Sequence, residues 1–124
     1  MSTTKPRLEP GPGHPITIAP TGKTVVVRVD GRVIAQSDRA LTLEEASYGP
    51  VQYLPLEDVD ATVLKGTEHT TYCPYKGDAS YYSVTSPDRE LENVVWTYEQ
   101  PFEAVADIAG HAAFYTDRLQ VSIG

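Results

Sequence analysis

The chain has 124 residues, of which 40% are hydrophobic and 22% charged, and its formal net charge is −7. The length suits a single hydrophobic core, and the composition is that of a globular domain. The acidic balance argues against a nucleic-acid backbone or an anionic membrane as the partner, because both require a basic face. No apolar run approaches the roughly 20 residues of a membrane span, and the first residues lack the apolar stretch of a signal peptide.

The single cysteine, Cys73, excludes a disulfide within the chain and a zinc site built from two or more thiolates. The three histidines form no HxH or HxxxH pair, which disfavours a histidine metal site. We therefore predict no metal and no cofactor, and a reducing, cytoplasmic location.

Residues 1–22 contain five prolines and three glycines and show no apolar period. This pattern predicts a poorly ordered leader. It is followed by a single β-rich domain over residues 23–124.

Alternating valines begin after residue 24, and Asp30-Gly31 marks a hairpin turn. A two-residue loop would pair Val27 with Ile34. A three-residue loop with Gly31 left-handed would pair Val27 with Val33 and produce one fully apolar face, so this register is preferred.

Many further short strands, separated by glycine and proline, predict a mainly β fold: a small curled β-sandwich or a partly open barrel. In the last strand, Leu119, Val121 and Ile123 are expected to face inward. A single helical turn is predicted over residues 56–59. The remaining strands are expected over residues 41–43, 51–54, 61–64, 79–84, 93–98, 112–115 and 119–123.

One short α-helix is predicted near the C-terminus. Pro101 suits a first helical position, and Phe102, Val105 and Ala109 fall on one stripe. Gly110 suits the end of the helix.

The segment 70–82 combines a thiol, an ammonium group, several hydroxyls and four tyrosines. Pro74 and Gly77 bracket a tight turn, so Cys73 and Lys76 should project from a constrained loop. A nearby lysine would lower the pKa of the thiol and create a nucleophile. The alternative is that Cys73 is a small buried packing residue and Lys76 a solvated turn residue.

Aromatic residues form a second pattern. Tyr81 and Tyr82 should face opposite sides of their strand, whereas Val94, Trp96 and Tyr98 should share one face. Aromatic rings that converge on a pocket stack flat ligands or surround cations. The alternative is ordinary core packing, which the large apolar area of Trp96 favours.

Glu45 continues the inward-facing series of Leu41 and Leu43. A carboxylate in that position needs a partner, and Arg39 or Lys76 could supply it.

His111 follows the predicted end of the helix. It would therefore interact with the helix C-terminus or act as a general acid or base.

Five groups of residues follow one another along the chain: Ser37-Asp38-Arg39-Ala40, Tyr53-Leu54-Pro55, Thr71–Gly77, Trp96-Thr97-Tyr98, and Ile108–His111 with Ala113-Phe114-Tyr115. Together they resemble the signature of the domain-of-unknown-function family 427, over about residues 24–123. The resemblance implies a small, mostly β bacterial protein without an established activity. The family also has a nucleotidyltransferase-like label, but this sequence contains no glycine-rich phosphate loop and no Gly-Ser followed by paired aspartates.

The first functional hypothesis is a module that binds a small molecule in an aromatic and polar pocket. Glu45, Lys76 or His111 would anchor polar groups of the ligand. The pocket would be shaped by Tyr75, Tyr81, Trp96, Tyr98 and Tyr115.

Two alternatives remain open. In the first, the chain is a hydrolase or transferase with Cys73 as nucleophile, Lys76 as its electrostatic activator, and His111 or Glu45 as proton carrier. In the second, it is a subunit that contacts a partner through a sheet edge or through the leader.

Overall fold

The computed structural model describes residues 5–124, and the fold is mainly β, as predicted. Short 3-10 turns replace longer helices; they are η1 (Leu56–Asp58), η2 (Ala61–Val63) and η3 (Glu103–Ile108). The described strands are β1 (Ile16–Pro20), β2 (Val25–Val29), β3 (Arg32–Ser37), β4 (Leu41–Glu45), β5 (Val51–Pro55), β6 (Leu64–Cys73), β7 (Gly77–Thr85), β8 (Glu90–Thr97), β9 (His111–Phe114) and β10 (Gln120–Ile123).

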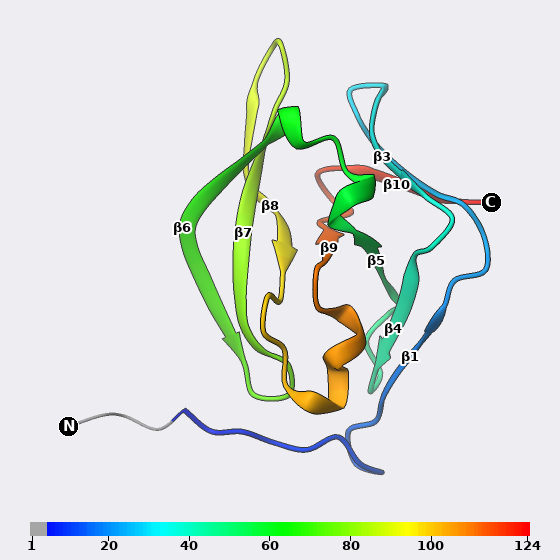
Figure 1. The fold of residues 1–124 in the computed structure, drawn as a ribbon, viewed down its shortest axis with the longest axis vertical. Helices are drawn as coiled ribbons and strands as arrows, with labels where there is room; N and C mark the ends of the chain where they lie inside the picture. The colour runs from blue at the N-terminus through cyan, green and yellow to red at the C-terminus, as the bar shows by residue number, and fades with distance from the viewer. Residues whose placement is uncertain (1–4) are drawn as a thin grey trace.

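The strands form two antiparallel sheets within the described part of the chain. The large sheet has the order β1-β4-β5-β9-β8-β7-β6, and the small sheet has the order β10-β2-β3. Figure 1 shows the large sheet curling from β6 on one side of the molecule to β1 on the other. Since β1 and β6 do not pair with each other, the sheet stays open rather than closing into a barrel.

Two buried clusters lie on opposite faces of the curled sheet. Tyr81 belongs to one and Tyr82 packs against the other, which confirms that these neighbours face opposite sides. The closed core joins both sheets and includes Val25, Val27, Ile34, Leu54, Val84, Val95 and Leu119. The aromatic cluster consists of Leu43, Tyr53, Ala79, Tyr81, Tyr98, Val105, Ile108 and Ala113.

The β2–β3 hairpin differs from the preferred register. Its loop has two residues, Asp30 and Gly31, both with positive φ (49° and 81°), as a type I′ turn requires. A β-bulge follows, because Val27 pairs with Ala35 and leaves Ile34 as an extra residue. The bulge turns both Ile34 and Ala35 inward, at 1% and 2% exposure. The predicted three-residue loop, with Val27 opposite Val33, is therefore wrong.

The α-helix predicted over residues 101–109 is also wrong. The structure has η3 instead, a 3-10 segment interrupted at Val105, where φ is −126° and ψ is 27°. Val105 and Ile108 are fully buried in the aromatic cluster. So short a segment gains little from helical hydrogen bonds, and packing decides its shape. The smaller prediction of a helical turn at 56–59 is confirmed by η1.

Part of the predicted leader is ordered structure. β1 pairs with β4 along the edge of the large sheet, with Ile18 opposite Leu43. Pro20 is tolerated because it ends an edge strand. The preceding residues cross the β6–β7 end of the sheet, where the Leu8 amide donates to the Pro74 carbonyl at 3.0 Å (Figure 1). Residues 1–4 of the leader lie outside the described residues.

Three strand predictions need correction. Residues 61–63 form η2, and the strand that follows is β6, a largely exposed edge strand without apolar alternation. Ile123 is 50% exposed rather than inward. Val94 and Trp96 do not share one face: Val94 packs in the closed core, whereas Trp96 contacts the aromatic cluster. The alternation is interrupted because Asn93 adopts a left-handed φ of 52° and the pairing of β7 with β8 shifts near it. No helix within residues 5–124 is long and apolar enough to cross a membrane.

Candidate functional site

A cavity of about 300 Å³, the inner cavity, lies against the aromatic cluster and is open to solvent. β4, β5, β7 and β8 contribute to its wall, together with the loop between β4 and β5. Six of the nine site residues predicted from the sequence line it: Glu45, Lys76, Tyr81, Trp96, Tyr98 and Tyr115. The other lining residues are Leu43, Tyr48, Gly49, Val51 and Tyr53.

The turn between β6 and β7 positions Lys76. As predicted, the turn is tight: the Lys76 amide donates to the Cys73 carbonyl at 3.2 Å, and Gly77 closes it with a φ of 107°. Phe102, in the segment after β8, stabilises the turn, because its amide N–H donates to the Lys76 carbonyl at 3.0 Å. Lys76 is only 7% exposed, so it is not the solvated turn residue of the alternative interpretation.

Glu45 is the partner of Lys76. The Lys76 ammonium donates to Glu45 Oε1, which identifies Lys76 rather than Arg39 as the cation expected beside this inward carboxylate. Arg39 pairs instead with Glu57 and Asp58. Both side chains of the Glu45–Lys76 pair are largely buried, with 13% and 9% exposure.

His14 completes the polar cluster, and sequence reasoning missed it because it lies in the predicted leader. Its Nε2 is 2.7 Å from Glu45 Oε2, and its ring stacks on Tyr75 with centroids 3.9 Å apart. Burial raises the pKa of Glu45, but the hydrogen bonds with Lys76 and His14 outweigh burial and leave that pKa below its ordinary value. Glu45 is therefore ionised at neutral pH.

Tyrosine hydroxyls supply the other polar groups of the inner cavity. Tyr53 accepts a hydrogen bond from Trp96 Nε1 at 3.3 Å, and Tyr81 shares one with Thr71 at 2.9 Å. Burial raises the pKa of Tyr53 to about 12 and also raises the pKa of Tyr98. These phenols are neutral at physiological pH. Tyr53 was not among the predicted site residues, although its alternation with Val51 could have indicated it.

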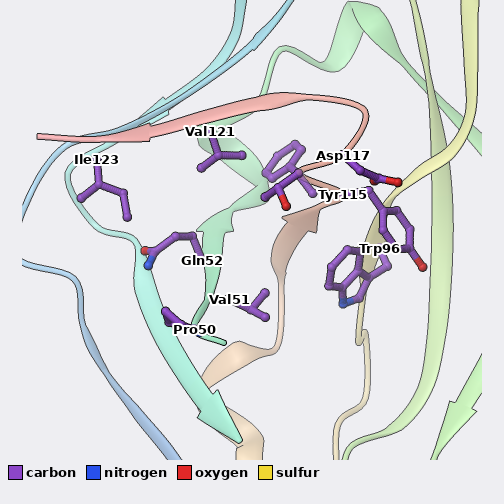
Figure 2. A pocket seen from close by; sticks show the side chains of 10 residues that line it. Pro50, Val51, Gln52, Trp96, Tyr115, Asp117, Val121 and Ile123 are labelled. Atoms are coloured by element: carbon purple, nitrogen blue, oxygen red, sulfur yellow. The ribbon is translucent and has the colours of Figure 1, made fainter. Parts of the chain in front are cut away.

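A second, larger cavity of about 440 Å³, the outer cavity, adjoins the first. The two share Val51, Trp96 and Tyr115, and the rings of Trp96 and Tyr115 are 4.7 Å apart and tilted by 51°. Figure 2 shows Trp96 and Tyr115 on one side of the outer cavity, with Ile123 and Pro50 on the other. Its lining contains no buried charged side chain, so the polar anchors lie in the inner cavity.

Three predicted site residues lie elsewhere. Tyr75 stacks on His14 and lines neither cavity. Cys73 is partly buried and packs against the aromatic cluster, in agreement with the packing interpretation, and it too lines neither cavity. His111 Nδ1 is 3.0 Å from the Ala109 carbonyl at the end of η3. Of the four predicted catalytic residues, only Glu45 and Lys76 come together.

The arrangement suits noncovalent recognition of a flat, partly polar molecule. Aromatic rings offer stacking surfaces, and the buried ion pair and the phenols offer hydrogen bonds at fixed positions. Within residues 5–124, no group of three or more His, Cys, Asp or Glu side chains could hold a metal ion.

Residues 17–123 match the profile of the family described as "Domain of unknown function (DUF427)". A search of curated proteins found no match. Because the match spans most of the chain, the resemblance noted in the sequence is confirmed: the chain belongs to the DUF427 family.

Proposed function

We propose that this DUF427 member binds a small molecule in the inner cavity. The observation that supports the proposal is convergence: stretches of the chain far apart in sequence bring Glu45, Lys76, Tyr98 and Trp96 to one hollow. A buried ion pair is costly to desolvate and contributes little to stability by itself. Its position on the wall of an aromatic cavity favours a role in recognition.

Trp96 makes the proposal testable without labels, because it is the only tryptophan and lines both cavities. A library of planar metabolites should contain compounds that quench its fluorescence saturably and raise the melting temperature. A ligand present at 100 times its Kd stabilises the folded state by about 2.7 kcal/mol. A broad library that produces neither effect would contradict the proposal.

Variants can locate the binding. Tyr48 lines the inner cavity but is 66% exposed, so Tyr48→Ala should weaken binding at little cost in stability. Cys73→Ala and His111→Gln are the matched controls, because neither residue lines the inner or the outer cavity. Equal losses of affinity in all three variants would place the ligand elsewhere. Loss of ligand turnover in Cys73→Ala would instead favour the nucleophile hypothesis.

A further inference from the structure

The inner cavity presents more hydrogen-bond donors than its own residues use. The Lys76 ammonium carries three N–H bonds, and within residues 5–124 its side-chain acceptor is Glu45. The Tyr53 oxygen accepts from Trp96 Nε1, so its own O–H remains available. The Tyr98 hydroxyl forms no hydrogen bond with a described residue, although Tyr98 is only 6% exposed.

The Tyr98 hydroxyl has no hydrogen-bond partner among the described residues, and its surroundings show why. Among the described residues, no buried side-chain nitrogen or oxygen lacks a partner. The unpartnered Tyr98 hydroxyl must therefore be reached by solvent, and the inner cavity that Tyr98 lines supplies the path. A ligand atom can therefore replace the water molecule that would otherwise form a hydrogen bond with this hydroxyl.

The carboxylate in the cavity wall is already occupied. Glu45 Oε1 binds Lys76, and Glu45 Oε2 lies 2.7 Å from His14 Nε2. The raised pKa values of Tyr53 and Tyr98, to which the charge of Glu45 contributes, keep both phenols protonated as donors. Within the described part of the chain, the wall of the inner cavity therefore offers free donors, whereas both oxygens of its only carboxylate already have partners.

Charge narrows the ligand class further. Lys76 and Glu45 compensate each other, so a ligand carboxylate would bring an uncompensated charge into a largely buried site. A ligand ammonium would have to share each Glu45 oxygen with a partner that already binds it. An uncharged carbonyl oxygen incurs neither cost.

We propose that the inner cavity selects uncharged planar molecules that present a carbonyl oxygen, such as an aromatic amide or lactam; this proposal rests on the proposed function. The oxygen accepts from Tyr98 and from one of the two other donors, Lys76 or Tyr53, because a carbonyl oxygen has two lone pairs. The ring lies against Trp96 and Tyr115 at the boundary with the outer cavity.

The test uses three probes with one ring system: 2-naphthamide, 2-naphthoate and 2-naphthylmethylamine. Their Kd values are measured by calorimetry at pH 7.5 on the full chain. We expect the amide to bind at least about tenfold more tightly than either charged probe, as the loss of one good hydrogen bond or an unpaired buried charge implies. Equal or tighter binding of the carboxylate or the amine overturns the ligand class but leaves the proposed function standing. Absence of binding by all three overturns the ligand class, and the proposed function is overturned as well only if the broad library also gives no binding.

Matched variants then identify the donors. Tyr98→Phe removes the hydroxyl and keeps the ring, and should weaken amide binding about fivefold to tenfold. Tyr82→Phe, on the opposite face of β7, should leave the Kd within about twofold, the ordinary scatter of distant substitutions. Near-ultraviolet circular dichroism checks that both variants are folded. If Tyr98→Phe binds the amide as tightly as the unmodified chain, the assignment is wrong.

Discussion

The two buried clusters of this protein are built from different chemistry. The closed core is mostly Val, Leu, Ile and Ala, whereas three of the eight buried members of the aromatic cluster are tyrosines. Aliphatic side chains carry no polar atoms and can fill space completely. Tyrosine hydroxyls need partners, so a cluster built around them retains polar, solvent-reached space. The difference suits one face of the curled sheet to stability, and the proposed function places ligand binding on the other.

The largest effect is expected in the closed core. Ile34→Ala should reduce the free energy of unfolding by about 2–4 kcal/mol, because the side chain is buried at the bulge. Val33→Ala, next to it and 43% exposed, should cost no more than about 0.5–1 kcal/mol. Urea unfolding measures both. Equal losses would contradict the bulged register, and a changed ligand affinity in Ile34→Ala would break the division between the clusters.

The ion pair beside the aromatic cluster should give the next effect. Lys76→Met leaves Glu45 largely buried without its cation and should cost about 1–3 kcal/mol. The control is the exposed pair of Lys5 and Asp78, where Asp78→Asn should cost about 0–0.5 kcal/mol. Adding Glu45→Gln to Lys76→Met should restore part of the loss in a double-mutant cycle. Without such recovery, the two side chains do not act as a pair.

Gly77 tests how the turn holds Lys76. Its φ of 107° strains any residue with a Cβ, so Gly77→Ala should cost about 1–2 kcal/mol and weaken ligand binding by shifting Lys76. Gly49→Ala is the control, because Gly49 lines the inner cavity with no positive φ and no atom within 4 Å of an added Cβ. Thermal unfolding and a ligand titration of both variants would separate the effect of backbone strain in the turn from the effect of adding a methyl group at the cavity wall.

The smallest effect concerns acid. The folded-state pKa of Glu45 lies below 4.5, so the stability that this ionisation contributes is present above pH 4.5 and is lost as the pH falls through the folded-state pKa. The difference in unfolding free energy between the unmodified chain and Glu45→Gln should therefore shrink below pH 4.5. Urea titrations at pH 7, 5 and 3.5 measure it. A difference that stays constant with pH would show that the carboxylate charge does not contribute.

Sequence patterns predicted those parts of the fold that local alternation determines. The inward series from Leu41 to Glu45 was readable because strand residues alternate strictly, and it led to the Glu45–Lys76 pair. The bulge at Ile34 was not readable, because one inserted residue changes the register without leaving a compositional signal. The helix expected around Val105 failed for a related reason, since packing into the aromatic cluster overrode a periodic pattern.

For the candidate site, the sequence indicated the chemistry of the residues but not which of them lie together. Residues such as Tyr81, Trp96 and Tyr98 stood out by their chemistry, and the curled sheet brings them to one cavity. Cys73 and His111 were also predicted site residues, yet Cys73 packs against the aromatic cluster and His111 lies at the end of η3, outside both cavities. Spatial convergence depends on strand order, and one sequence contains no direct signal for β9 lying between β5 and β8.

The contact between His14 and Glu45 ties the segment before β1 to the inner cavity. His14 lies just before the region that matches the family, yet its Nε2 is 2.7 Å from Glu45 Oε2. Removing the residues up to His14 would therefore take away one of the two described partners of this carboxylate and leave every described strand in place.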